Sequence, residues 1–551
     1  MTINFGYPCL YKGSWRTCRQ RQLIQKHIIE KRKKGSVLKC LYLPLHSFYL
    51  FLLIFVCQTK IYIVNLFPPS KTMRCSILVF LLPLIIAQEV TCFNKHAPPL
   101  SHFRNKFKDR MAMAMAISSQ PPSPSPSTKM SGRVVYPAEY GADPTGAHES
   151  SDSIEKAVED AFGIESEGEL VGGVRDLGGV VIDLQGGNYT ISKPIKFPSS
   201  GGGNLVVKGG TLRASDSFPT DRHLVELWAS NSQNLPRTSL FNSMKLQQPN
   251  GIYYEDITFR DILFDSGHRG GGIFIADSVR TRINNCFFLH FTTEGILVEG
   301  GHDTFISNTF LGQHSTVGGD KGERNFSGTA IDLASNDNAI TDVAIFSAAI
   351  GVLLRGQANI LTGVHCYNKA TGFGGIGILV KLAGNSQTRI DNCYMDYTAI
   401  VMEDPVQVHV TNGFFLGDAN IVLKSVEGKI CGLNIVDNMF SGNPNNKVPI
   451  VSLDGEFSNI DQVITDRNSV IGMSLRSTVG KLIVGGNGTK WVADFSNVLL
   501  FPNRISHFQY SFYAEGETKF LAHSVTNVTN NVVVVESEKP AQGVVSFLVE
   551  Q

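Results

Sequence analysis

The sequence has almost no net charge, which limits what it can bind. It contains 49 Lys and Arg against 48 Asp and Glu, so its formal charge is +1, and charged residues make up only 18% of the chain. Nucleic acids are bound through a strong positive field, which so balanced a composition does not supply, so we expect no nucleic-acid partner. A low charged fraction is ordinary for an extracellular β-rich protein.

Cysteine is sparse in the part of the chain that can fold. Of ten cysteines, the five beyond residue 87 are Cys92, Cys286, Cys366, Cys393 and Cys431. Their wide scatter matches neither a disulfide framework nor the spacing of metal ligands. We therefore expect no metal site and no cofactor.

Long hydrophobic runs are missing as well, and only two short apolar stretches occur near the N-terminus. Phe48–Val56 is short for a membrane span, so we do not favour an anchor there. The second stretch starts at Met73, continues through Ile77–Ile86 and reaches a small residue, Ala87, as a secretory signal does. The sequence therefore predicts a secreted protein whose true initiator is Met73.

A segment rich in proline and serine, Pro121–Ser127, follows this signal. Such a composition cannot bury a core and is typical of a linker. Sequons that would be glycosylated on the secretory route occur at four positions, namely Asn188, Asn325, Asn487 and Asn527.

What the sequence does contain is a repeat. Short apolar quartets such as Gly295–Val298 recur at intervals of about 21 to 26 residues, with one longer interval of 35. A second motif recurs out of phase with the quartets. It consists of an aliphatic residue, one spacer and then Asn or Asp, as in Ile283–Asn285. Two interleaved strand signals per period indicate one coil of a solenoid, whose strands stack about 4.8 Å apart in parallel sheets.

The repeated Asn or Asp falls at a corner between sheets. We expect its side-chain amide to bond the same amide of the next coil and to satisfy the backbone of the turn. The predicted ladder, with Gly363 as a gap, consists of Asp261, Asn285, Asn308, Asp342, Asn392, Asn412 and Asn438.

The two ends of the repeat region have different patterns. Asp152 and Glu155 form a predicted capping box, and the following apolar residues fall on one face of a helix that can cover the first coil. Near residue 460 the rhythm is lost, and Val532–Val535 and Val544–Phe547 indicate a small C-terminal β region. We therefore expect the fold class to be all-β, a parallel β-helix with an N-terminal capping helix and a small β-rich C-terminal region.

These signals divide the chain into five parts. Residues 1–72 are a gene-model extension or disordered, 73–87 a signal peptide, 88–132 the linker, 133–460 the parallel β-helix and 461–551 the β-rich C-terminal region.

Three segments resemble a known family. Tyr140–Gly146, Asp152–Ala157 and Gly178–Ile182 are similar to the opening of the pectate-lyase-superfamily domain, and residues 133–551 as a whole resemble the plant QUARTET-type polygalacturonases. The resemblance implies that the β-helix is right-handed and of the pectin-lyase-like kind. It also implies hydrolysis of de-esterified homogalacturonan, with inversion and without a metal, in the extracellular cell wall. It also makes pectic polysaccharide the expected partner of a protein that we expect to be a monomer.

The chain departs from the motifs of the larger polygalacturonase family. That family carries Asn-Thr-Asp, Asp-Asp, Gly-His-Gly and Arg-Ile-Lys on successive coils. Here Glu294 stands where the Asp of the first motif belongs, no Asp-Asp follows, Ala349–Gly351 replaces Gly-His-Gly and Thr388–Asp391 only echoes the last.

Candidate catalytic carboxylates lie just before the apolar quartets. Inverting glycosidases need a carboxylic acid and a carboxylate base about 6.5–9.5 Å apart, which neighbouring coils can provide. Glu294 directly precedes a quartet and is the predicted acid. The next coil has a long insertion, and Asp320 or Glu323 within it is the predicted second carboxylate.

A polyuronide also needs cations or proton donors in its binding groove. The predicted substrate-binding residues are His268, Arg269, His314, Arg324, Arg355 and Lys381. Two other functions stay open: a polysaccharide lyase, which would use Arg or Lys as base and usually Ca²⁺, and a non-catalytic wall-binding protein, which the missing motifs favour.

Overall fold

The computed structural model describes residues 133–164, 168–170, 173–228, 251–313, 327–367, 375–516 and 520–551. The predicted signal peptide and linker lie outside these residues. So do five predicted site residues, namely His314, Asp320, Glu323, Arg324 and Asn325.

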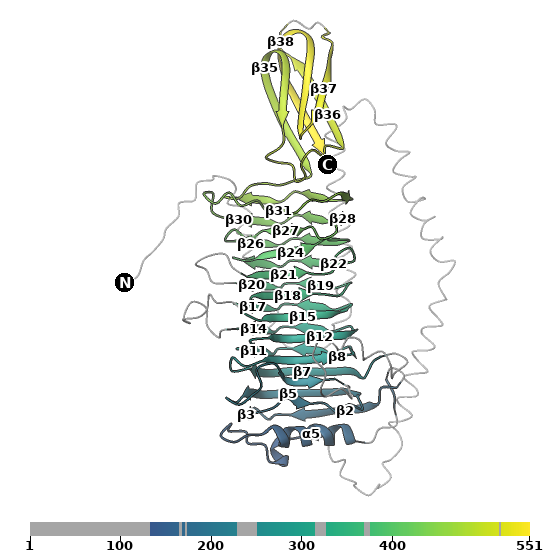
Figure 1. The fold of residues 1–551 in the computed structure, drawn as a ribbon, viewed down its shortest axis with the longest axis vertical. Coiled ribbons are helices and arrows are strands. Elements are labelled where there is room, and N and C mark those ends of the chain that lie inside the picture. The colour runs from purple at the N-terminus through teal and green to yellow at the C-terminus, as the bar shows by residue number, and fades with distance from the viewer. Residues whose placement is uncertain are drawn as a thin grey trace, which may run out of the picture. The chain divides into compact units, whose positions relative to one another are not determined.

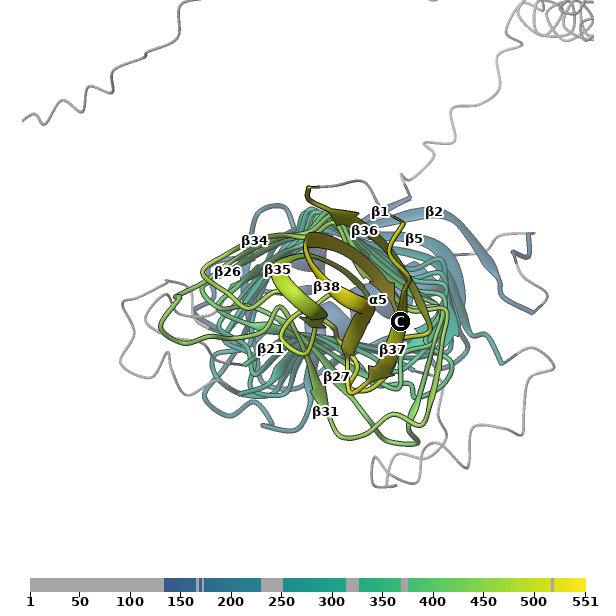
Figure 2. The ribbon, with the colours of Figure 1, turned by 90° about the horizontal axis from the view of Figure 1, so that it is seen from above.

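The chain winds into a parallel β-helix with three strand-bearing faces around one core (Figures 1 and 2). The first face contains β2 (Asp176–Asp183), β5 (Gly202–Ala214), β7 (Tyr254–Asp265), β10 (Arg282–Asn284), β13 (Phe305–Ser307), β16 (Ala339–Thr341), β19 (Ile360–Thr362), β22 (Thr388–Asp391), β25 (Val408–Thr411), β29 (Asn434–Val436) and β33 (Ile464–Asp466).

The second face contains β3 (Asn188–Ile191), the ends of β5 and β7, β11 (Phe287–Leu289), β14 (Phe310–Gly312), β17 (Ala344–Phe346), β20 (His365–Tyr367), β23 (Tyr394–Asp396), β26 (Phe414–Leu416), β30 (Met439–Ser441) and β34 (Ser469–Ile471). The third face contains β4 (Ile195–Lys196), β6 (His223–Leu227), β8 (Gly271–Ala276), β12 (Glu294–His302), β15 (Thr329–Asn336), β18 (Ile350–Leu354), β21 (Ile376–Val380), β24 (Ala399–Glu403), β27 (Ile421–Lys424) and β31 (Val451–Asp454).

Four short strands complete the coils: β1 (Val134–Val135), β9 (Ser278–Val279), β28 (Lys429–Cys431) and β32 (Asn459–Asp461). The predicted fold class is confirmed, because every pairing among the coils is parallel and each quartet lies on the third face. The coils continue to β34, past residue 460, where the sequence loses its rhythm.

The core is built from identical positions on successive coils. Ile273, Ile296 and Ile331 are paired across β8, β12 and β15, and all three are fully buried. The rings of Phe264 and Phe288 stack with centroids 4.6 Å apart. Each coil thus buries its apolar side chains against the coils on either side, which explains why a single coil cannot fold alone.

The corner between the first and second faces requires an unusual backbone. Asn285 and Asn308 have φ of 51° and 50°, in the left-handed region that Asn and Asp tolerate better than most residues. Their backbone N–H groups donate to the next coil, Asn285 to the carbonyl of Ser307 at 3.1 Å and Asn308 to that of Thr341 at 3.1 Å. Backbone conformation therefore selects these residues.

The predicted amide ladder at this corner is wrong in two respects. Side-chain bonds along it are intermittent: Asn285 donates to Asp261 at 2.7 Å, whereas Asn308 has no such bond within the described chain. Asn438 is not a corner residue, because Asp437 takes the left-handed conformation in its coil. Asn438 is buried instead, and its Nδ2 donates to Asn468 Oδ1 of the next coil at 3.1 Å.

Helix α5 (Ser151–Gly163) lies at the N-terminal end of the stack (Figure 1), after a 3-10 turn, η2 (Pro137–Tyr140). Its apolar face, which includes Ile154 and Phe162, is buried, as the pattern predicts for a capping helix. The predicted capping box is wrong: the side chain of Glu155 contacts Lys193, and Glu149 Oε1 accepts the N–H of Ser151 at 2.8 Å.

The C-terminal region is an antiparallel sheet of β35 (Val479–Asp494), β36 (His507–Ala514), β37 (His523–Thr529) and β38 (Val532–Glu550). The two valine-rich segments of the sequence lie on one long strand, β38. Between β35 and β36, Leu500 and Phe501 are buried in the core of the β-helix, which closes its last coil. Neither helix in the described chain has the length and apolar character of a membrane-spanning helix.

Candidate functional site

The third face carries a group of charged side chains on three neighbouring coils. Asp332 interrupts the apolar strand β15, and because side chains alternate along a strand it lies on the outer side, between the inward Ile331 and Leu333. Glu294 begins β12 on the preceding coil, and Arg355 directly follows β18 on the next. The predicted acid therefore lies one coil from Asp332, a carboxylate that was not among the predicted site residues.

Asp332 is held by the guanidinium of Arg355. Nε of Arg355 lies 2.8 Å from Oδ1 of Asp332, and Nη2 lies 3.0 Å from Oδ2. Burial raises the pKa of Asp332, the bonds and charge of Arg355 oppose this, and the charges of Glu294 and Glu299 raise it further. Asp332 therefore combines a raised pKa with an orientation that is fixed by Arg355.

Glu294 interacts with a histidine two coils away. His223 on β6 is paired with Gly271 on β8, and Nε2 of His223 lies 3.3 Å from Oε2 of Glu294. A Cβ on Gly271 would lie only 2.4 Å from Cδ2 of the His223 ring and 2.4 Å from the carbonyl oxygen of Glu294. The bare glycine thus allows the imidazole to reach Glu294.

More charges continue along the same face. Arg222 pairs with Glu226, whose carboxylate also accepts Trp228 Nε1 at 3.2 Å. On the other side of Arg355, Nη2 lies 3.5 Å from Glu299 Oε1. Burial, together with the nearby charge of Glu299, raises the pKa of Asp277 to about 6. Carboxyl groups with raised pKa values gathered on one face are typical of catalytic sites.

His268 and Arg269 lie at the turn before β8, next to the Glu294 coil. Arg269 donates through Nε to the carbonyl of Phe218 at 2.6 Å, and the ring of His268 lies 4.6 Å from that of His290. Gly270, which follows, donates its N–H to Thr292 Oγ1 at 3.1 Å. The turn therefore contacts Thr292, which precedes Glu294 by two residues. Part of the Arg269 guanidinium is already bonded to the backbone of Phe218.

Of the other predicted cations, Lys381 is exposed and Arg355 is paired. Lys381 follows β21, and its backbone N–H donates to the carbonyl of Leu354 on the preceding coil. Lys381 and Arg355 are therefore neighbours on successive coils. The structure thus brings Glu294, Arg355 and Lys381 to one face.

Three sequons differ in exposure. Asn188 is half-buried at the start of β3, and its Oδ1 is buried, whereas Asn487 and Asn527 are exposed on β35 and β37.

Asp332 also had a signal in the sequence. It is the only charged residue inside the apolar quartets of the repeat, in Ala330–Leu333. An acid at an outward strand position within an otherwise apolar quartet needs a partner, which Arg355 supplies. His223 gave no comparable signal, because its pairing depends on a glycine of another coil.

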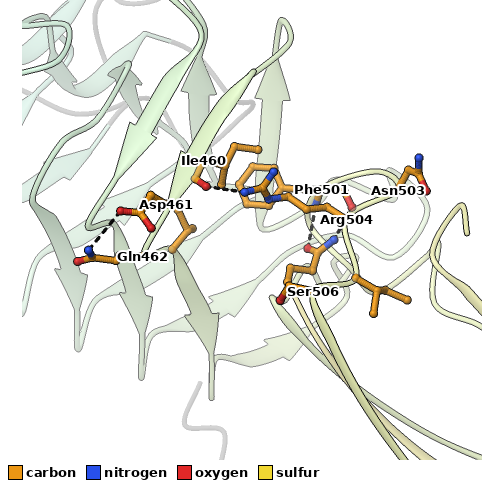
Figure 3. A pocket seen from close by; sticks show the side chains of 10 residues that line it. Ile460, Asp461, Gln462, Phe501, Asn503, Arg504 and Ser506 are labelled. Atoms are coloured by element: carbon orange, nitrogen blue, oxygen red, sulfur yellow. Dashed lines mark hydrogen bonds between the residues drawn. The ribbon is translucent and has the colours of Figure 1, made fainter. Parts of the chain in front are cut away.

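The described part of the chain also has a cavity away from Glu294. A cavity of about 500 Å³ lies beside the last coil, where Arg504 donates to the carbonyl of Ile460 and Gln462 to Asp461 (Figure 3). It contains none of the predicted site residues.

Within the described ranges, no three His, Cys, Asp or Glu side chains are grouped closely enough to hold a metal ion.

Known proteins are similar to this chain either in structure or in sequence. No protein-family profile matches the chain. Among solved structures, the A-module of mannuronan C-5 epimerase AlgE4 from Azotobacter vinelandii is 13% identical, with a TM-score of 0.38 over 61% of this chain and 95% of that one. The tailspike protein gp49 of Pseudomonas phage LKA1 is 9% identical, with a TM-score of 0.38 over 75% of this chain and 99% of that one.

Sequence similarity is much higher to a plant protein. Over 423 residues the chain is 54% identical to Polygalacturonase QRT3 of Arabidopsis thaliana, which covers 76% of this chain and 84% of that one. At that identity and coverage, the chain belongs to the family of Polygalacturonase QRT3.

Proposed function

We propose that this protein is a glycoside hydrolase that cleaves α-1,4-galacturonosyl linkages of pectin with inversion. The observation that carries the proposal is the placement of Glu294 and Asp332 on the neighbouring strands β12 and β15 of one face. The relative that is 54% identical bears the name of a polygalacturonase, which supports the same substrate.

The two carboxyl groups divide the reaction between them. Glu294, as a carboxylic acid, gives its proton to the glycosidic oxygen, and the bond from that oxygen to the anomeric carbon breaks. Asp332, as a carboxylate, takes a proton from a water molecule whose oxygen attacks the anomeric carbon from the opposite side. The product has a new reducing end of inverted configuration.

Substrate contacts come from the cations of the same face. Lys381 is exposed one coil beyond Arg355, and His268 and Arg269 lie at the turn beside the Glu294 coil. An ammonium group and a guanidinium group are suitable partners for galacturonate carboxylates, so we propose that homogalacturonan binds along this face of the coils.

Product analysis tests the proposal. Purified protein is incubated with polygalacturonate, and new reducing ends and absorbing double bonds are measured together, while NMR follows the anomeric configuration. A hydrolase gives reducing ends without double bonds. Unsaturated ends would identify a lyase, and retained binding without either product would identify a non-catalytic wall-binding protein, so both results would reject the proposal.

Paired variants test the residues. Glu294→Gln and Asp332→Asn keep the shape of each side chain but remove its proton chemistry, and each should lower kcat by about a hundredfold or more. Asp454→Asn changes an exposed acid at the far end of the same face and should leave kcat unchanged. If Asp332→Asn is active while Asp320→Asn or Glu323→Gln is not, the insertion supplies the base instead.

We also propose that the protein is secreted to the cell wall and acts there as a monomer. A chain that starts at Met73 should be exported and begin near Gln88, which N-terminal sequencing of the secreted protein checks. Asn487 and Asn527, which are exposed, should carry glycans more completely than the half-buried Asn188. Retention of that chain inside the cell would reject secretion.

A further inference from the structure

Arg355 is engaged by carboxylates from two other coils. Its Nε and Nη2 form a fork on Asp332 at 2.8 and 3.0 Å, and Nη2 also lies 3.5 Å from Glu299 Oε1. The Asp332 side chain is only 9% exposed, against 28% for Arg355. Two parallel N–H···O bonds fix the orientation of a carboxylate as well as its charge.

This arrangement changes the role expected for Arg355 from the sequence. The Nε and Nη2 groups of Arg355 are bonded to Asp332, and Nη2 also lies near Glu299, so two carboxylates already balance the charge that a galacturonate carboxylate would need. An ionised carboxylate as buried as Asp332 is in turn costly without a cation beside it. The structure therefore links Arg355 to Asp332 more closely than to the substrate.

We propose that Arg355 is a positioning residue, which keeps the Asp332 carboxylate ionised and aimed at the attacking water, and that it does not bind the substrate. This inference rests on the proposed function, because it takes Asp332 as the base. Its consequence is that Arg355 governs the pH at which the enzyme becomes active and governs kcat, whereas KM is set by residues such as Lys381.

Kinetics of two substitutions test this role. Arg355→Met removes both the positive charge and the pair of hydrogen bonds to Asp332. Asp332 should then become protonated at a higher pH, so the acid limb of the kcat/KM profile should shift to higher pH. A displaced base should also lower kcat by about a hundredfold while KM stays within about twofold. Arg355→Lys keeps the charge and loses the fork, so the limb should move less while kcat still falls.

An exposed pair of the same geometry provides the control. Arg467 Nε lies 3.0 Å from Asp437 Oδ1 and Nη2 lies 2.8 Å from Oδ2, at a corner of the last coils. Arg467→Met should leave kcat, KM and both limbs of the pH profile unchanged. Because it removes an identical fork, it separates the role of Arg355 from a general effect of losing an ion pair.

A double-mutant cycle on thermal unfolding accompanies the kinetics. Arg355→Met should destabilise the protein clearly less in an Asp332→Asn background than in the wild type, because the buried charge is then already gone. A raised KM with kcat and the acid limb unchanged would show that Arg355 binds substrate and would overturn the inference. An inactive wild-type protein would instead overturn the proposed function.

Discussion

His223 reaches Glu294 across two coils, with Nε2 3.3 Å from Oε2, because Gly271 on the intervening strand has no side chain. The His223 side chain is 2% exposed, and Nε2 makes no hydrogen bond of good geometry with any described residue. The buried Nε2 of His223 therefore faces the carboxylate of the predicted acid.

Replacement of His223 should therefore affect catalysis. The ring packs against Phe274 with centroids 5.8 Å apart, so His223→Phe should be accommodated, yet it removes the nitrogen facing Glu294. We expect kcat to fall by about tenfold or more with KM little changed, and His223→Gln, which can place an amide nitrogen there, to retain more activity. Steady-state kinetics on polygalacturonate measure both.

His507→Phe is the matched control for this substitution, since His507 is exposed on β36. It should have wild-type kinetics. Wild-type turnover by folded His223→Phe would show that the contact with Glu294 plays no part in the reaction.

Asn308 tests why Asn recurs at the corners. It has φ of 50° and is exposed. If the left-handed backbone selects Asn, Asn308→Ala should cost about 1 kcal/mol of unfolding free energy and Asn308→Gly little. An amide ladder predicts an equal loss for both. Denaturant unfolding of the three proteins distinguishes the two explanations, and equal losses would restore the ladder.

Asp277 should make stability depend on pH. Burial and the charge of Glu299 raise its pKa to about 6 in the folded state, above its ordinary value in the unfolded chain. Between these two values the folded state holds more protons, so this residue's contribution to stability falls as pH rises from about 4 to about 6 and then levels off.

Asp277→Asn isolates this contribution, because Asn tolerates the left-handed φ of 48° at that position. The variant should be more stable than the wild type at pH 7 and no more stable at pH 4. Asp303→Asn, at another left-handed corner with φ of 60°, should not show this difference. Thermal unfolding of all three proteins at both pH values provides the measurement, and parallel curves for Asp277→Asn and wild type would contradict it.

The buried thiols should be inert in the folded protein. Burial raises the pKa of Cys286 and that of Cys393 to about 12 each, and both are free. They are four coils apart, about 19 Å, whereas a disulfide needs Cα atoms within about 7 Å. Among the cysteines of the described ranges, we expect the half-buried Cys431 to be alkylated before the buried ones.

Mass mapping after brief alkylation checks this prediction. A peptide joining Cys286 to Cys393, or faster labelling of either than of Cys431, would contradict the stacking order of the coils.

The sequence alone determined the repeat, and with it the fold. Apolar quartets must be buried, one coil cannot bury them, and the only solution is to stack equivalent positions, as Ile273, Ile296 and Ile331 do. The residue type at the corners was equally readable, because few residues adopt a left-handed backbone. Register was less certain: the sequence placed Asn438 at the corner, and the pairing of β29 with β25 puts Asp437 there instead.

The contacts of the candidate site were decided by the tertiary structure. Glu294 could be selected from its position before a strand, but its neighbours, His223 and Asp332, are far from it in the sequence and come from other coils. Whether two outward side chains on different coils meet depends on the exact register, on the size of the residue between them and on competing charges. Gly271 leaves room for His223 to reach Glu294, and Arg355 bonds to Asp332, and no local sequence pattern encodes either contact.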